Sequence, residues 1–354
     1  MLNKVHQRNG YILTLTMIII SMLVILVTRM FFSSSTLSSF ASIAVQREQA
    51  KMLALGGIRI ASSKLYISAQ TTEKSETQPT DKHTPQVDIN KKLLEQIIPF
   101  INTWQTVKFD RATDGVDGTV RYYITCEEGK IHLNDLLTII SDPKLPEAKR
   151  TFYQRLFKKI MDANTISGNL FTSAIDFFEK RKHIWLNDST ELLTAHGFDQ
   201  FSNAIFIAPQ NTKDKQTKNT AYLTDLFTMQ SRYGKLDPWV LSRATCLALG
   251  ITYPEDNAIK DRLKATFKNY KKNYNWAVDW DAIFKPIYNI EFAALGKEFV
   301  SLLPGNNEPF NPIAFAVTAY ANVGNVTQGM CALLLRRKLP DQSLAFIPIK
   351  SYWI

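Results

Sequence analysis

YILTLTMIIISMLVILVT, residues 11–28, is the stretch that decides how this chain is built. It contains no charged residue, no glycine and no proline, and residues 29–32 (RMFF) extend it. At about 1.5 Å per residue, a helix of this length crosses a hydrocarbon layer about 30 Å thick. Lys4, His6 and Arg8 precede it, which favours a cytoplasmic N-terminus and export of the rest of the chain. We therefore predict a transmembrane helix over residues 11–32.

The helical pattern continues beyond this segment. Residues 33–70 form its predicted amphipathic half, and one helix from about residue 11 to about residue 66 would be about 80 Å long. The glycine pair at 56–57 weakens the helix locally and could bend it. The predicted apolar stripe consists of Ile43, Ala50, Leu53, Ala54, Ile58 and Ala61. An alternative is ordinary secretion with cleavage near Ser42, because the serine-rich segment before it resembles a small-residue cleavage site.

Beyond the long helix, the pattern alternates between strands and helices. Residues 103–109 and 119–125 are rich in β-branched and aromatic residues, and the DGVDG sequence between them suits a hairpin turn. Residues 127–129 (EEG) are interpreted as a second turn, and Asn134 with Asp135 suits the N-cap of a helix. Helical patterns dominate from about 136 to 302, with helices predicted at 150–161, 171–181, 223–230, 238–249, 258–272 and 291–303. Residues 312–354 return to strands. This order predicts an α+β fold, with the early and late strands in one antiparallel sheet against the second half of the long helix, and a large all-α insertion as a separate lobe.

The predicted domain boundaries follow from these patterns. Residues 71–88 are polar and rich in Glu, Lys, Ser, Gln and Pro, which is typical of a flexible connection. The parts are a leader at 1–10, the transmembrane helix at 11–32, the amphipathic half at 33–70, a linker at 71–100, strands at 101–132, the inserted helical domain at 133–303 and the C-terminal strands at 304–354.

Composition gives little sign of chemistry. The 354 residues are 45% hydrophobic and 21% charged, which allows a large buried core. The net charge of +10 permits anionic partners, but the basic residues are scattered. Their densest group, Lys268, Lys271 and Lys272, is interpreted as a solvated face. No phosphate-binding loop, dinucleotide fingerprint, HExxH or GxSxG motif occurs, so we do not expect an enzyme.

The remaining candidate groups are interpreted as structural. His132, His183 and His196 are expected to be structural or exposed, and Trp276 and Trp280 are expected to pack in the core beside Asp279 and Asp281. The three cysteines form no CxxC pair, so no local zinc or redox motif exists. One pair could bridge in an oxidising compartment, and at least one thiol is expected to be buried and inert.

Basic residues, then Gly10, then a long apolar helix resemble the class III signal of type IV pilins and pseudopilins. In that family a prepilin peptidase cuts after the glycine and the apolar helix stays in the mature protein. The matching bond here is Gly10–Tyr11, and its cleavage would lower the net charge from +10 to +8 by removing Lys4 and Arg8. Most pilins carry a Glu at the fifth mature position, whereas this chain has Leu15.

Three later segments extend the resemblance to one particular family of pseudopilins. YITCEEGKIHLNDLL at 123–137, LFTMQSRYGKLDPW at 226–239 and FAVTAYANVG at 315–324 are similar to segments of the general secretion pathway protein K family. These are minor pseudopilins of type II secretion that typically lack the Glu. The EEGKIHLN segment is the most specific of the three.

The resemblance implies a role and a location. The chain would be a non-enzymatic tip subunit of a pseudopilus that takes part in protein secretion. It would be anchored by one helix in the bacterial inner membrane, with a methylated mature N-terminus in the cytoplasm and the C-terminal domain in the periplasm. Its partners would be other minor pseudopilins, the major pseudopilin, prepilin peptidase and membrane lipid. Calcium has been described in members of the family, but no DxDxD loop occurs here, so no residue is assigned to it.

Two other functions remain open. A minor pilin of a type IV pilus or DNA-uptake system would use the same anchor. A membrane-anchored nucleic-acid binder is suggested by residues 235–251, which resemble half of a helix-hairpin-helix motif. That motif needs a glycine-bearing hairpin, and only Gly250 is present, so we interpret the segment as helix packing and expect no nucleic acid.

Overall fold

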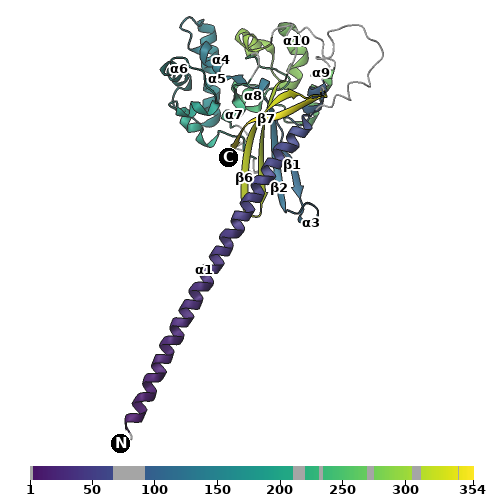
Figure 1. The fold of residues 1–354 in the computed structure, drawn as a ribbon. Helices are drawn as coiled ribbons and strands as arrows, with labels where there is room; N and C mark the ends of the chain where they lie inside the picture. The colour runs from purple at the N-terminus through teal and green to yellow at the C-terminus, as the bar shows by residue number, and fades with distance from the viewer. Residues whose placement is uncertain are drawn as a thin grey trace.

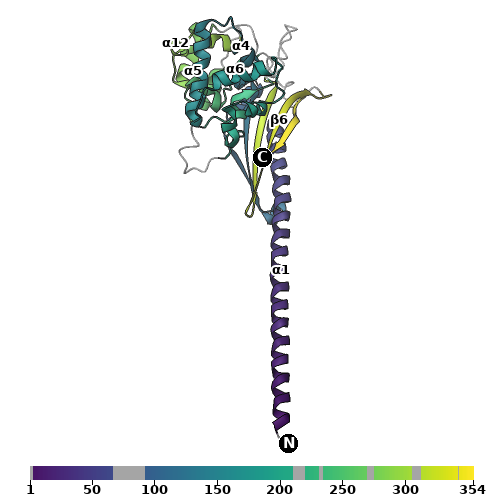
Figure 2. The same cartoon turned by 90° about the vertical axis from the view of Figure 1, so that its left-hand side faces the viewer.

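The computed structural model describes residues 3–66, 92–209, 220–230, 234–268, 275–304, 312–341 and 343–354, with the backbone alone for residues 3–10. Helix α1 (Asn3–Lys64) projects from a body made of a β-sheet and a helical lobe. Figures 1 and 2 show the lobe at the end of the molecule opposite the N-terminus. The predicted connection at 71–88 lies outside the described residues.

Helix α1 has two halves of different character. The side chains of its apolar half are exposed, and hydroxyls there donate to carbonyl groups one turn back, as Thr16, Ser21 and Thr28 do. Such bonds satisfy the hydroxyls within the helix, so they need no water. The second half buries the stripe Ala50, Ala54, Ile58, Ala61 and Leu65. This stripe has helical spacing and small residues, so the helix can lie close against the sheet.

The observed stripe differs from the predicted one at its N-terminal end. Ile43 is half exposed and lies before the first contact with the sheet, and Leu53 is only partly buried. The stripe therefore begins at Ala50, where the body of the protein begins to cover α1. The helix also continues without interruption through Gly56 and Gly57.

The sheet has the order β1-β2-β5-β6-β7, and every neighbouring pair is antiparallel. The strands are β1 (Gln105–Phe109), β2 (Gly118–Cys126), β5 (Ala314–Val323), β6 (Val326–Lys338) and β7 (Leu344–Trp353). Helix α1 contacts β2, β5, β6 and β7. The predicted α+β fold is confirmed, and so is the pairing of early with late strands in one sheet on the second half of α1.

The lobe is inserted between two neighbouring strands. In the ladder of β2 and β5, Cys126 lies opposite Phe315, so the chain leaves the sheet and returns to it at almost the same point. The elements between them are η3 (Glu127–Gly129), β3 (Ile131–His132), α4 (Leu133–Ile140), α5 (Glu147–Asn164), α6 (Leu170–Lys180), η4 (Ser189–Thr194), η5 (Phe198–Asn203), α7 (Leu223–Leu226), β4 (Phe227–Thr228), α8 (Arg243–Leu249), α9 (Asn257–Lys268), α10 (Trp276–Ile283), α11 (Lys285–Tyr288), α12 (Phe292–Leu295) and η7 (Lys297–Leu302).

The predicted hairpin of the two early strands is confirmed, because β1 and β2 are consecutive and pair antiparallel. Its connection contains a turn of helix, α3 (Arg111–Asp114), that was not predicted. Asp110 accepts from Ala112 N at the start of α3, and Gly115 ends it with φ of 75°. These two caps stabilise the helical turn within the connection.

Residues 92–101 also differ from the expectation of a linker up to residue 100. Residues 92–97 are helical, and the buried apolar side chains of this segment are Leu93, Leu94, Ile97, Ile98 and Ile101. The segment belongs to the hydrophobic core, because spacing of three and four residues places these side chains on one face.

Gly57 allows the close approach of α1 to the sheet. A Cβ atom at this position would lie 2.7 Å from Val120 Cγ1 and 3.0 Å from Ala319 Cβ, whereas at Gly56 it would meet nothing within 4 Å. We expect Gly57→Ala to lower the free energy of unfolding by about 1–3 kcal/mol through overpacking. The measurement is urea denaturation of the full chain in detergent.

Gly56→Ala is the matched control for this substitution. It should raise the free energy of unfolding by up to about 1 kcal/mol, since alanine is the better helix former. Adding Val120→Ala to Gly57→Ala should cost less than the sum of the two single effects, because the clashing methyl is gone. Equal effects of alanine at 56 and 57 would contradict this packing.

Candidate functional site

The residues that the sequence singled out for processing and assembly all lie on α1. Gly10 and Tyr11 are adjacent within the continuous helix, and Leu15 follows one turn later. Tyr11 is 73% exposed and Leu15 is 47% exposed. No other described element contacts this end of α1, so Tyr11 and Leu15 lie on an exposed helix surface and face no partner group among the described residues. The segment that begins at Tyr11 is long and apolar enough to span a membrane.

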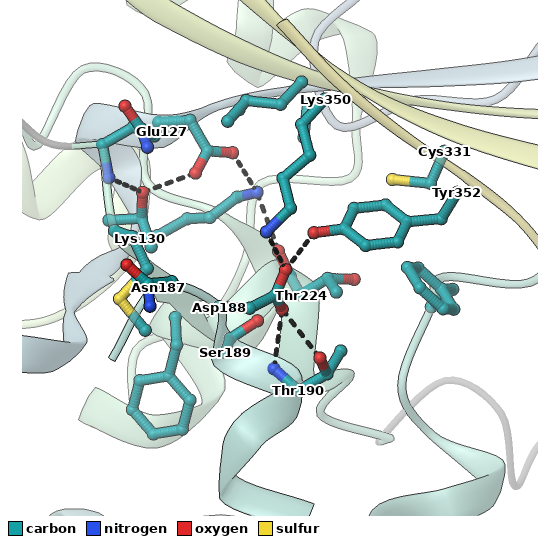
Figure 3. Close-up of a pocket in the computed structure, with 17 residues that line it drawn as sticks. Glu127, Lys130, Asn187, Asp188, Ser189, Thr190, Thr224, Cys331, Lys350 and Tyr352 are labelled. Atoms are coloured by element: carbon teal, nitrogen blue, oxygen red, sulfur yellow. Dashed lines mark hydrogen bonds and ion pairs between the residues drawn. The ribbon is translucent and has the colours of Figure 1, made fainter. Parts of the chain in front are cut away.

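A small pocket of about 70 Å³ lies where the lobe meets the sheet (Figure 3). On one side of it, Lys130 Nζ lies 2.5 Å from Glu127 Oε1 and donates to the carbonyl of Thr224 at 2.8 Å. Glu127 also accepts from Thr228 Oγ1 at 2.5 Å. Lys130 is almost completely buried. This pair connects the segment after β2 to α7 and β4.

The surroundings of Lys130 favour its charged form. Burial alone would lower the pKa of this ammonium, but the negative charges of Glu127 and Asp225 outweigh burial and raise it. Lys130 is therefore protonated at neutral pH. Its ammonium group is one partner of an internal ion pair with Glu127 and does not serve as a proton donor for catalysis.

A second polar group in Figure 3 connects the lobe to the edge strand. Asp188 is the N-cap of η4 and accepts from Thr190 N at 2.8 Å. The same carboxylate accepts from Lys350 Nζ and Tyr352 Oη, which come from β7. Although burial would raise the pKa of Asp188, these hydrogen bonds outweigh burial and lower it. Asp188 is thus a charged anchor for the last strand.

The pocket has no activated nucleophile. Cys331 lines it, but burial raises the pKa of this thiol to about 11, so the reactive thiolate form is scarce at neutral pH. The carboxylates and ammonium groups of the pocket are occupied by the bonds above. The arrangement can hold the lobe against the sheet.

A third buried group surrounds the end of β2. Glu128 Oε1 accepts from Ile313 N at 2.8 Å, and Cys126 Sγ lies 3.1 Å from Glu128 Oε2. The backbone carbonyl of Glu128 accepts from Asp237 N at 2.8 Å. Burial raises the pKa of Glu128 to about 7 and also raises that of Asp237. Glu128 therefore fastens both ends of the insertion, at Cys126 and Ile313.

The sequence indicated the EEGK segment only through a family resemblance and interpreted it as a turn. Glu127, Glu128, Gly129 and Lys130 are all buried. The position of the EEGK residues directly after a strand of apolar residues was the only sign in the sequence that they could be buried. The sequence could not show that Thr228, which is distant along the chain, donates a hydrogen bond to Glu127.

The helix start predicted at Asn134 and Asp135 is wrong by two to three residues. His132 is the N-cap of α4, and its Nδ1 accepts from Asp135 N at 3.3 Å. Asn134 lies inside α4, and its side chain exchanges two hydrogen bonds with the backbone of Leu186. Asn134 thus holds the 186–188 loop next to α4, and His132 has a structural role.

The aromatic pair in α10 behaves as expected. Trp276 and Trp280 are buried in the core. Asp279 accepts from Asn275 N at 2.6 Å and Asp281 accepts from Phe292 N at 2.9 Å, so both carboxylates satisfy backbone groups. These contacts account for the alternation of Trp and Asp without a bound ligand.

The cysteines and metal-ligating residues give no site. Cys126, Cys246 and Cys331 are free and buried, which confirms the expectation of at least one buried thiol. Within the ranges that the structure describes, no group of three His, Cys, Asp or Glu side chains could hold a metal ion. Lys271 and Lys272 of the predicted basic group lie outside those ranges.

Comparison with solved structures gives a likeness in fold. No family model and no curated protein matches the sequence. A chain in the crystal structure of the GspK-GspI-GspJ complex from the enterotoxigenic Escherichia coli type 2 secretion system is similar over 91% of this chain and 99% of its own length, with 10% identity and a TM-score of 0.37. So low a TM-score adds nothing to the fold assignment, which rests on the long helix and the strand order described above.

Proposed function

We propose that this chain is a minor pseudopilin, a non-enzymatic tip subunit of a type II secretion pseudopilus that takes part in protein secretion. The single observation that carries the proposal is the division of α1 into two halves of different character. Its first half is an exposed apolar rod, and its second half is the support on which an antiparallel sheet packs. Before assembly, the exposed apolar side chains of this half can lie in the hydrocarbon of a membrane. After assembly, they can pack against the same helices of other subunits.

The proposal includes processing and location. Prepilin peptidase cuts the Gly10–Tyr11 bond, and the mature chain begins at Tyr11 with a methylated amine. The helix then anchors the chain in the bacterial inner membrane, with the sheet and lobe in the periplasm. Other minor pseudopilins, the major pseudopilin and membrane lipid contact the exposed part of α1.

Leu15 supports the proposal that this chain occupies the first position in the filament, at its tip. In the family that the sequence resembles, a Glu at the fifth mature position pairs with the N-terminal amine of the subunit ahead. An unpaired charge in hydrocarbon is costly, so this pairing selects the register. Leu15 cannot make the pair, so the chain gains nothing from a subunit ahead of it. Its own amine at Tyr11 can still attract the subunit behind.

The location of the lobe also supports placement of this chain at the filament tip. It lies at the end of the molecule opposite the N-terminus, beyond the sheet (Figure 2). At the tip of a filament, this end faces open space and the lobe meets no neighbour ahead. Inside a filament, a subunit ahead would have to share that space with it.

The experiment locates the chain on filaments and then restores the missing charge. Immunogold labelling and cysteine crosslinking to the major pseudopilin should place the native chain at filament ends only. Leu15→Glu should shorten filaments and lower secretion, because the new ion pair draws the lobe into an interior position. A gain of about 1.4 kcal/mol already changes such a distribution tenfold.

Leu13→Glu is the matched control, since it introduces the same charge two residues away on the same exposed segment. Leu13→Glu should not change filament length as Leu15→Glu does, because a carboxylate at position 13 is not aligned with the N-terminal amine of the subunit ahead. Native chain found repeatedly along filaments, or never in contact with a pilin, would refute the tip assignment. A mature chain that begins near Ser42 would indicate ordinary secretion.

A further inference from the structure

A second cavity, of about 200 Å³, lies between the sheet and the lobe. It exceeds the volume of about 150 Å³ that holds a benzene molecule in an apolar cavity. Aromatic rings form much of its wall, and they belong to Trp104, Tyr123, Tyr222 and Tyr253. The ring centroids of Trp104 and Tyr123 lie 5.2 Å apart. Walls of this kind suit the apolar body of a small molecule.

Most of the charges that line this cavity already have an opposite charge. Asp225 Oδ2 accepts from Ala244 N at 2.9 Å, and the positive charges of Lys130 and Arg243 act on the same carboxylate. Arg243 Nη2 also lies 2.8 Å from Glu255 Oε1. These groups balance one another within the protein, so a guest in the cavity has no anion of the lining left to neutralise.

Lys260 is the exception among the charged residues of the lining. It is 5% exposed, and its Nζ donates to the carbonyl of Ile101 at 3.1 Å and to Thr103 Oγ1. Both acceptors are neutral, and they use two of the three N–H groups of the ammonium. Within the part of the chain that the structure describes, Lys260 forms no ion pair.

The electrostatics of Lys260 agree with this geometry. The negative charge of Glu255 favours the ammonium, but burial outweighs it and lowers the pKa of Lys260 to about 8. Glu255 is half exposed and is already bonded to Arg243. The buried cation would therefore be stabilised by a carboxylate that binds its remaining N–H group.

We propose that this cavity is a binding site for a small monocarboxylate with an aromatic or apolar body. The carboxylate accepts a hydrogen bond from Lys260, and the body packs against the aromatic rings. An ammonium group or a second carboxylate on the guest would meet no opposite charge in the described lining, so both lower the affinity. The site goes beyond the assembly role proposed above, and neither depends on the other.

The test uses the purified full chain in detergent and 3-phenylpropionate as the probe. Calorimetry should give saturable binding, and thermal denaturation should move to higher temperature as the ligand concentration rises. Two analogues separate the contacts, because 3-phenylpropanamide lacks the charge and acetate lacks the aromatic body. Each should bind at least about tenfold more weakly than 3-phenylpropionate.

The pH dependence of binding tests the role of Lys260 without a substitution. With a pKa of about 8, Lys260 loses most of its charge between pH 7 and pH 9, so 3-phenylpropionate should bind about tenfold more weakly at pH 9. The affinity for 3-phenylpropanamide should not follow this change. The other titratable or charged residues of the lining are Tyr123, Tyr222, Tyr253, Asp225, Arg243 and Glu255. Burial raises the pKa of these three tyrosines, so they stay neutral over this range.

Lys260→Met keeps the length of the side chain and removes its charge. It should weaken 3-phenylpropionate binding at least about tenfold, abolish the pH dependence and leave the affinity for 3-phenylpropanamide unchanged. Lys108→Met, on the outer strand β1 and outside the cavity lining, is the control and should bind 3-phenylpropionate normally.

Three results would each overturn the proposal: no saturable signal with 3-phenylpropionate, equal affinity at pH 7 and pH 9, or Lys260→Met binding as tight as that of the native chain. The pH series is measured on the native chain, so it decides the matter even if Lys260→Met does not fold. Filament position is measured separately, so failure here leaves the tip assignment standing.

Discussion

Replacing Lys130 with methionine is expected to lower the free energy of unfolding by about 3–5 kcal/mol, as is usual when one partner of a buried ion pair is removed. The substitution leaves Glu127 buried, with only Thr228 as a side-chain donor among the described residues. It also leaves the carbonyl of Thr224 without the bond from Nζ. Denaturant titration of the full chain in detergent, followed by tryptophan fluorescence, measures the change.

The double variant Glu127→Gln with Lys130→Met is the control. It removes both charges and keeps side chains of similar volume, and an amide can still bond to Thr228. We expect it to recover most of the lost stability, because a buried pair replaced as a whole is often close to neutral. A double variant as unstable as Lys130→Met alone would mean that packing, rather than the uncompensated charge, causes the loss.

Gly129→Ala is expected to be comparably damaging, with a loss of about 3 kcal/mol or more. A Cβ atom at Gly129 would lie 1.9 Å from the carbonyl oxygen of Val240. That contact is with backbone, and the same segment is held by the bond from Ser242 N to Gly129 O at 3.0 Å. The clash can therefore be relieved only by separating η3 from residues 240–242. The unfolding free energy in denaturant is again the measurement.

Two comparisons isolate this clash. Gly56→Ala makes the same chemical change in open space and should not destabilise the chain. Val240→Ala added to Gly129→Ala should give no rescue, because the clashing atom is a backbone oxygen, whereas Val120→Ala should partly rescue Gly57→Ala. If Val240→Ala did rescue Gly129→Ala, the close approach would involve side chains and our description of this junction would be wrong.

The sequence could predict those elements whose signal is local and long. The apolar run at 11–28, the strands near 119–125 and after residue 312, and α5 and α6 all carry many residues in one period. The predicted pairing of early with late strands also held, because a helical block between two strand groups leaves few other sheets. The burial of Trp276 and Trp280 followed from the same reasoning.

The sequence could not predict where neighbouring elements interrupt a local pattern. A helix was predicted over 223–230, but α7 ends at Leu226 because Phe227 and Thr228 pair with β3 instead. A helix was predicted over 238–249, but α8 starts only after its N-cap Ser242. The predicted helix at 291–303 is divided at Gly296, whose φ of 83° ends α12. A tertiary contact, a cap and a glycine each overrode the local preference.

The candidate sites were harder still. Gly10, Tyr11 and Leu15 were found from the order of residues in one segment, and their roles remain predictions. The buried ion pair of Glu127 and Lys130 could not be found, because charged residues in a turn are normally solvated. The cavity around Lys260 was also missed, since its lining comes from segments as far apart as Asn102 and Lys260. Only folding brings such residues together.

The position of the lobe between β2 and β5 has a consequence for the order of folding. The two strands that form this ladder are separated by 191 residues at the pair Thr125 and Ala316, so the ladder closes a very long loop. A two-stranded hairpin such as β1 and β2 is marginal alone, and β5, β6 and β7 follow the whole lobe in the chain. Much of the buried stripe of α1 therefore stays uncovered until β5, β6 and β7 join the sheet. A chain without these strands exposes that part of the stripe, whereas a chain with them hides it, so the arrival of the late strands changes the surface of α1.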